Sequence, residues 1–151
     1  MTPLLKKLNF KNHKDFFVIN SPEEFNAQKL EIKEYVDIID ESQINEISFI
    51  LVFVENCAEI EFWADKINPH LIDDANLWFA YLKKSSKKYK SDISRDNGWQ
   101  VLGDYGYEPV RQVAIDDDWS ALRFRRAENI KTMTRNPSMA MSKSGKERLK
   151  K

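Results

Sequence analysis

The sequence predicts an α/β fold in which helices cover both faces of a mostly parallel sheet, with one antiparallel strand near the C-terminal end. Consecutive strand–helix–strand units indicate this class, because right-handed crossovers join parallel strands. Only the acidic turn 116–118 separates the last two strands, which favours an antiparallel pair. A chain of 151 residues, 42% of them hydrophobic, is long enough for one such core. We therefore expect a small Rossmann-like sheet.

The first strand is expected at residues 15–20, where a nearly continuous apolar run is typical of a strand buried on both faces. A helix to about residue 33 should follow at once. Ser21 is its candidate N-cap, Pro22 suits the first helical position, and Glu24 would complete a capping box.

The middle of the chain predicts two more strands and a helix. Residues 35–39 form the second strand, and residues 48–54, apolar from Phe49 onward, form a central one. The helix after them starts near Asn56 or Cys57 and ends before Pro69, because the residue preceding a proline disfavours the helical region. Its apolar stripe has the spacing i, i+3, i+4 and i+7 and consists of Ile60, Trp63, Ala64 and Ile67.

The C-terminal third predicts three strands and one helix. The strands are expected at residues 77–82, 109–115 and 119–126. The helix should begin at the N-cap Ser94 and end near residues 103–105. Gly106 is available for the left-handed position just past that end.

The charge of the chain changes sign near its end, although its formal net charge is zero. We expect residues 1–130 to form a single, mildly acidic α/β domain and residues 131–151 to form a basic, disordered tail. The tail has seven basic residues, one acidic residue and too few apolar side chains to offset the cost of ordering. Weak nucleic-acid binding through this tail is one alternative function. No aromatic residue follows Phe124 to stack on bases.

Composition places the protein in a broad cellular class. Cys57 is the only cysteine, so no intramolecular disulfide forms. The longest apolar run, residues 49–54, is too short to cross a bilayer, and the N-terminus lacks the features of a secretory signal. We expect a soluble cytoplasmic protein without a membrane partner.

Four short segments resemble the signature of a known family. They are residues 77–81, the basic loop 83–86, residues 91–96 and residues 119–124. Together they are similar to a family of small bacterial proteins of unknown function, over about residues 14–127. The order of elements also resembles the C-terminal half of class I S-adenosylmethionine-dependent methyltransferases. These resemblances imply a Rossmann-like fold and no particular activity.

The methyltransferase resemblance implies two features of a cofactor site. A glycine-rich turn after the first strand lets backbone approach the cofactor, and an acidic residue at the end of the second strand holds the ribose. Asp40 or Glu41 could supply the acid. The turn itself reads Asn20-Ser21-Pro22-Glu23-Glu24, and the first glycine of the chain is Gly98. We therefore expect no cofactor, because side chains and negative charge replace bare backbone at this turn.

Candidate ligand-binding residues lie where the strands end, since open parallel sheets bind ligands beyond the carboxyl ends of their strands. The lysines and serines of the loop 83–86 suit a phosphate or carboxylate, although a solvated loop is the more ordinary interpretation. The candidates are Ser21, Lys83, Lys84, Ser85, Ser86, Asp116 and Trp119.

Several residues whose side chains could bind a ligand or take part in catalysis also have an ordinary structural interpretation. Residues 116–118 could bind a divalent cation or supply a general base, but adjacent aspartates favour an exposed turn. Trp119 could stack on a ligand, although core packing is favoured. Cys57 at a helix start could be a nucleophile, but acidic neighbours disfavour its thiolate. His13 and His70 lack metal-ligand spacing, and the sequence predicts no metal site and no catalytic residue.

These observations favour a non-catalytic or regulatory domain that binds a small anionic ligand or a protein partner at the carboxyl edge of the sheet. The first alternative is a degenerate S-adenosylmethionine-dependent methyltransferase. The second is the weak nucleic-acid binder described above.

Overall fold

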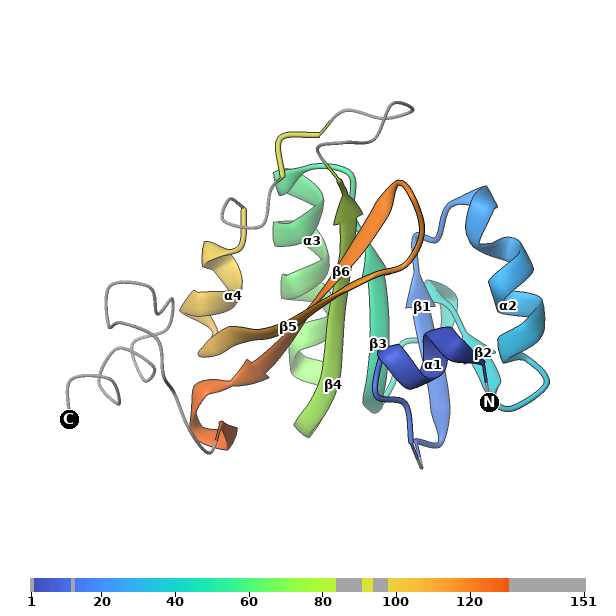
Figure 1. Ribbon diagram of the computed structural model, residues 1–151. Coiled ribbons are helices and arrows are strands. Elements are labelled where there is room, and N and C mark those ends of the chain that lie inside the picture. Colours follow the sequence, from blue (N-terminus) through green and yellow to red (C-terminus); the bar gives the residue numbers. More distant parts are fainter. Residues whose placement is uncertain (1, 12, 84–90, 94–97, 131–151) are drawn as a thin grey trace.

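A computed structural model describes residues 2–11, 13–83, 91–93 and 98–130, which form a six-stranded sheet between layers of helices (Figure 1). The strand order is β2-β1-β3-β4-β6-β5. Strands β2, β1, β3 and β4 pair in parallel, and β6 is antiparallel to both β4 and β5. The predicted mostly parallel sheet with one reversed strand is confirmed. The strands are β1 (Asp15–Ile19), β2 (Asp37–Ile39), β3 (Ile47–Phe53), β4 (Leu71–Leu82), β5 (Tyr107–Ala114) and β6 (Trp119–Arg126).

Helices pack on both faces of this sheet, as predicted. One face carries α3 and α4, and the other carries α1 and α2. The helices are α1 (Pro3–Lys7), α2 (Asn26–Ile32), α3 (Cys57–Ile67) and α4 (Gln100–Asp104). Single 3-10 turns occur as η1 (Glu23–Phe25), η2 (Glu41–Gln43), η3 (Asn68–His70) and η4 (Ala127–Asn129). Among the described residues, no helix combines the length and apolar character needed to cross a membrane.

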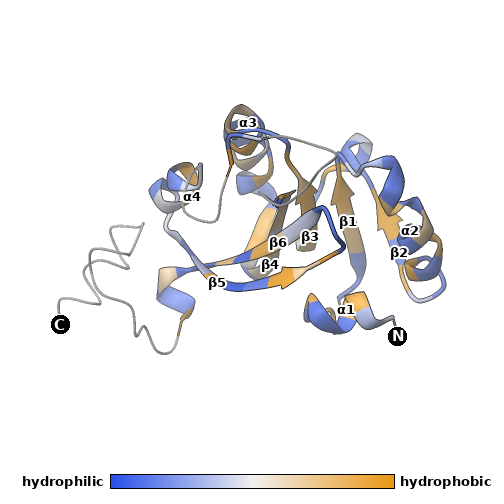
Figure 2. Cartoon of the chain, turned by 45° about the horizontal axis from the view of Figure 1, so that its top comes forward, coloured by the Kyte–Doolittle hydropathy of each residue, from blue (hydrophilic) through white to orange (hydrophobic). Residues whose placement is uncertain are grey.

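Strand β3 is central because its alternate side chains enter two separate cores. Ile50 and Val52 pack under α3 and α4, whereas Leu51 and Phe53 pack under α1 and α2. All four are essentially unexposed. Figure 2 shows hydrophobic colour along the central strands β1, β3 and β4, and a mixture of hydrophobic and hydrophilic residues on the helices. Burial on both faces explains the uninterrupted apolar run of this segment.

Helix α1 was not expected from the sequence. Thr2 caps it by accepting a hydrogen bond from the Leu5 backbone N–H at 3.1 Å, and a proline follows at the first helical position. Leu5 and Leu8 are buried. The Trp78 Nε1–H donates to the Leu8 carbonyl at 3.0 Å, which fastens the end of α1 to the sheet. Five residues are too few to show a helical period, so the Thr-Pro pair was the one local signal.

The predicted capping box after β1 is wrong. Pro22, not Ser21, occupies the N-cap position of η1, and no side-chain hydrogen bond caps this turn. The Glu24 carboxylate accepts a hydrogen bond from the Trp119 indole N–H instead. Phe25 meanwhile turns its ring onto Phe53. These two tertiary contacts override the local preference for an α-helical first turn.

Several predicted boundaries also move. Tyr35 lies in an exposed turn after α2, so the second strand is shorter than expected. Strand β4 starts earlier than predicted and contains an irregularity at Asp74, whose φ is 55°. Gly106 adopts a φ of 92° just past α4, as predicted. The predicted helix start at Ser94 is wrong, because Gly98 is not helical and α4 begins at Gln100 with Trp99 at the N-cap position. Ser94 itself and the tail 131–151, with its predicted disorder, lie outside the described residues.

Candidate functional site

The carboxyl edge, where β1 to β4 end, gathers the predicted site residues that the structure describes. Ser21 follows β1 by two residues, and Lys83 directly follows β4. Because β6 runs in the opposite direction, the turn from Asp116 to Trp119 lies at this edge too. The Lys83 backbone N–H donates to the Asp118 carbonyl at 2.8 Å, which joins the two loops. The remaining candidates Lys84, Ser85 and Ser86 lie outside the described residues.

Polar side chains connect the ends of β1 and β3 at the switch point of the sheet, which we call the crevice. Successive strands leave β1 on opposite sides here, and this is the point at which open α/β sheets bind ligands. Asn20 adopts a φ of 58°, and its Nδ2 donates to the Phe53 carbonyl at 3.0 Å and to Glu59 Oε2 at 3.2 Å. Glu59 Oε1 accepts the Glu55 backbone N–H at 2.6 Å. Asn20 and Glu59 therefore connect β1, β3 and α3 across the crevice.

Sequence reasoning did not identify Asn20 and Glu59 as a pair. A signal for Asn20 existed, because asparagine is one of the few non-glycine residues that tolerate the left-handed conformation after a strand. Glu59 gave no such signal. Its role depends on how α3 lies against the end of β1, 39 residues away in sequence from Asn20.

Trp119 belongs to the core rather than to an open ligand surface. It is 1% exposed, and its ring lies edge-on to Phe53 with centroids 5.1 Å apart. Its Nε1–H donates to Glu24 Oε1 at 3.1 Å. Core packing, the interpretation favoured for Trp119, thus describes its position. The hydrogen bond also ties η1, beyond β1, to the start of β6.

The acidic turn is organised by one of its own carboxylates. Asp116 Oδ1 accepts the backbone N–H groups of Asp118 and Trp119, both at 2.8 Å. This is the Asx-turn geometry expected of a turn-forming aspartate. Within the described ranges, no group of three or more histidine, cysteine, aspartate or glutamate residues could hold a metal ion.

The N-terminus of α3 is occupied by carboxylate and amide groups of the chain itself. The Cys57 backbone N–H donates to Asp92 Oδ1 at 2.9 Å, and the N-cap Asn56 accepts from the Glu59 N–H at 2.9 Å. Burial raises the pKa of the Cys57 thiol above its ordinary value, and Asp92 raises it further. A thiol held in its neutral form is a poor nucleophile. This environment matches the inert interpretation of Cys57.

Asp40 stands directly after β2, where the methyltransferase resemblance places a ribose-binding acid. Its side chain is exposed, and Oδ1 accepts from the Ser42 hydroxyl at 2.5 Å and from the Ser42 backbone N–H at 2.9 Å. The hydroxyl hydrogen bond is the largest cause of a lowered pKa for this carboxyl group. Asp40 is therefore ionised at neutral pH and available at the edge.

An open hollow of about 480 Å³ lies beside the edge strand β2. Asp15 and Asp37, the first residues of β1 and β2, are among its lining residues. The lining follows the whole of β2 and includes Gln43 of η2, so the hollow lies beside the edge strand, whereas Asn20 connects β1 to β3.

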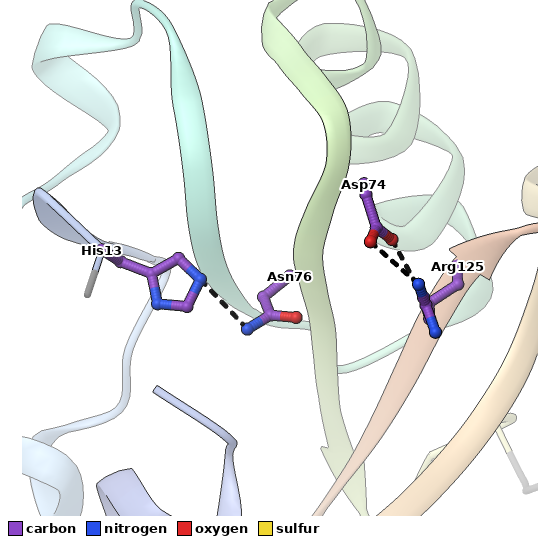
Figure 3. A network of polar contacts seen from close by, with 4 residues as sticks. All are labelled: His13, Asp74, Asn76 and Arg125. Carbon is purple, nitrogen blue, oxygen red and sulfur yellow. Dashed lines mark hydrogen bonds and ion pairs between the residues drawn. The ribbon is translucent and has the colours of Figure 1, made fainter. Parts of the chain in front are cut away.

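A second polar network lies on the face of the sheet that carries α1 (Figure 3). Asn76 Nδ2 donates to the Asn9 carbonyl at 3.1 Å and lies 3.2 Å from His13 Nε2. Asp74 binds Arg125 through two hydrogen bonds, of 2.9 and 2.8 Å. These contacts join the segment after α1 and the last strand to β4.

We expect His13, a member of this network, to make the stability of the protein depend on pH. Burial lowers the pKa of His13 below its ordinary 6.5, and the charges of Arg123 and Lys11 lower it further. The unfolded chain then binds the His13 proton more tightly than the folded chain. The free energy of unfolding should therefore fall as the pH drops below about 6.5.

We expect His13→Gln to lose part of this dependence in urea denaturation between about pH 7 and about pH 5. His70→Gln, at an exposed histidine, is the matched control and should keep the dependence of the original chain. Equal pH dependence in His13→Gln and the original chain would contradict this role of His13.

No protein-family model matches the sequence, and no curated protein matches it significantly. Solved structures do match. The N-methyltransferase NodS from Bradyrhizobium japonicum WM9 has a TM-score of 0.51 at 13% identity, over 82% of this chain and 91% of that one. A putative type 11 methyltransferase from Sulfolobus solfataricus has a TM-score of 0.51 at 10% identity, over 89% and 93%. The B. subtilis tRNA methyltransferase TrmK has a TM-score of 0.52 at 10% identity, over 92% and 73%.

The chain has a methyltransferase-like fold. Identities of 10–13% show this fold alone and carry no activity over to the chain. In this methyltransferase-like fold, the crevice bridged by Asn20 and Glu59 is the region to compare with a cofactor site.

Proposed function

We propose that this protein is a non-catalytic domain of methyltransferase-like fold that does not bind S-adenosylmethionine. Its ligand, a small anion or a protein partner, would bind at the carboxyl edge. Ser21, Lys83 and Asp116 are the residues of this proposed site that the structure describes and that would contact the ligand. Lys84, Ser85 and Ser86 complete the proposed site. The observation that carries the proposal is the bridge from Asn20 to Glu59 across the crevice between β1 and β3.

The bridge opposes cofactor binding for steric and electrostatic reasons. A nucleotide-type cofactor needs close approach to backbone at the turn after β1. There the Asn20 side chain spans the crevice, and Pro22 has no N–H to donate. The carboxylate of the cofactor's methionine would also approach Glu59 and the glutamates of η1. Like charges at short range repel most strongly where water is excluded.

Thermal denaturation with and without S-adenosylmethionine tests the proposal. We expect no saturable change in the midpoint. A ligand present at one hundred times its dissociation constant would add about 2.7 kcal/mol of stability, which is easily measured. The double variant Asn20→Gly, Glu59→Gln removes the bridge and serves as the comparison. A saturable shift at micromolar cofactor in the original chain would overturn the non-catalytic proposal.

The second candidate is an S-adenosylmethionine-dependent methyltransferase, which the fold likeness and Asp40 favour. Asp40 offers an ionised carboxylate at the end of the second strand, suited to accept hydrogen bonds from ribose hydroxyls. If the cofactor does shift the midpoint, Asp40→Asn should greatly reduce that shift. Asp37→Asn, at the other end of the same strand, is the matched control and should leave it unchanged.

A further inference from the structure

Two arginines lie opposite one another on the face of the sheet that carries α1. Arg123 of β6 is the register partner of Arg111 of β5. Two residues further along, Ala121 pairs with Val113, and both pack against the core beneath α1 and α2. Side chains alternate between faces along a strand, so both arginines lie on this same face. In Figure 1, neither α1 nor α2 lies in front of the β5–β6 hairpin.

The positive charge of this pair is only partly balanced by the described neighbours, because Asp74 acts on Arg123 without forming an ion pair with it. Side chains directly opposite on antiparallel strands are about 4.5–5.5 Å apart at Cβ, and like charges there are destabilising. Both oxygens of the nearby Asp74 carboxylate accept hydrogen bonds from the guanidinium group of Arg125. Glu108, the register partner of Arg125, is completely buried. No ion pair with Arg111 or Arg123 occurs among the described residues.

Within the described part of the chain, Arg123 also lacks a hydrogen-bond acceptor for one of its buried N–H groups. Its side chain is partly buried, and its Nε is a buried polar atom with no hydrogen-bond partner among the described residues. Burial lowers the pKa of Arg123, and the charges of Arg125 and Arg111 add to that effect while Asp74 opposes it. A buried guanidinium N–H without an acceptor costs free energy, so an oxyanion whose binding supplied that acceptor would recover this cost.

The neighbouring segment after α1 adds further donors and cations. Arg123 and Lys11 both act electrostatically on His13, so their charges reach the same region. Asn76, which contacts His13, fixes this segment against β4 (Figure 3). The face around Arg111 and Arg123 is thus bounded on the α1 side by polar and cationic groups.

We propose that Arg111 and Arg123 form a binding site for the phosphate group of a small phosphorylated compound. Two guanidinium groups supply two positive charges, which match a phosphate dianion, and their forked N–H groups suit bidentate contacts to its oxygens. Arg123 is four residues along β6 from Trp119, or about 13 Å. The site is therefore separate from the carboxyl edge and goes beyond the function proposed for that edge.

Inorganic phosphate is the probe for this site. At constant ionic strength, phosphate should stabilise the full chain saturably relative to chloride and should shift the Arg123 Nε–H resonance in NMR. Arg111→Gln and Arg123→Gln should each weaken binding by roughly tenfold or more. Arg111 is exposed, so its replacement leaves the core intact.

Arg126→Gln is the matched control, because it removes the same charge from the same strand. The guanidinium of Arg126 lies over the Tyr107 ring, on the other face, and its loss should change affinity by less than about twofold. A phosphate response that does not saturate, that persists in Arg111→Gln, or that Arg126→Gln weakens equally would overturn the proposal.

A second arm identifies the source of the phosphate. A nucleoside monophosphate is compared with a single-stranded oligonucleotide at several salt concentrations. Equal or weaker binding of the oligonucleotide supports a small phosphate ester. Tighter oligonucleotide binding that falls steeply with salt would overturn the assignment to a small compound and favour a nucleic-acid backbone.

Discussion

Replacing Phe53 with alanine is expected to lower the free energy of unfolding by about 3–5 kcal/mol. Phe53 is 1% exposed and ends the central strand β3. Its ring lies 4.9 Å from Phe25 and 5.1 Å from Trp119, measured between centroids. The substitution removes apolar contact and leaves a cavity that these neighbours cannot fill. Urea denaturation monitored by circular dichroism measures the loss.

Phe62→Ala is the matched control for this experiment, because it makes the same chemical change on the outer surface of α3. The Phe62 side chain is 56% exposed, and its main contacts are the edge of Trp63 and the Lys66 ammonium group. We expect a loss below about 1 kcal/mol. Similar losses for the two variants would show that Phe53 does not occupy a packed core.

Replacing Trp78 with alanine is expected to destabilise the protein by about 3–5 kcal/mol and to release α1 from the sheet. Trp78 is completely buried, and its indole N–H holds the Leu8 carbonyl. Without the ring, the apolar side of α1 loses the buried surface of the sheet against which it packs. Hydrogen exchange should show faster exchange of the α1 amides than of the β3 amides.

Trp78→Phe separates the ring from its hydrogen bond. It keeps most of the aromatic surface but leaves the Leu8 carbonyl without its donor, which costs about 1–3 kcal/mol when the group is buried. The loss should therefore be smaller than in Trp78→Ala, while α1 still exchanges faster. Unchanged α1 exchange in both variants would contradict the fastening role of Trp78.

The directions of the strands followed from local patterns, whereas their order in the sheet did not. Residues 48–54 predicted a central strand because every side chain after Ser48 is apolar, and such a run is stable only when both faces are covered. The short turn at Asp116 predicted the antiparallel pair of β5 and β6, since it is too short for a crossover. The bounds of α3 followed from its cap Asn56 and from Pro69.

The sequence predicted where the candidate site lies in the sheet, but it did not predict the contacts between its side chains. Ser21, Lys83 and Asp116 were assigned to one edge because strand ends meet there in a parallel sheet. The bridge between Asn20 and Glu59 could not be predicted, because it depends on the distance between α3 and β1 after packing. The pairing of Arg111 with Arg123 likewise depends on register, which a bulge between Pro109 and Arg111 shifts by one residue.

The sequence by itself determined the fold class, the central strands and the absence of a glycine turn after β1, because these depend on side-chain type and spacing along short stretches. Tertiary structure decided the docking of α1, the use of Glu24 as the partner of Trp119, and the bridged crevice. Each of these contacts joins segments at least 39 residues apart. Local propensity carries no information about such contacts, since they form only when the sheet brings their elements together.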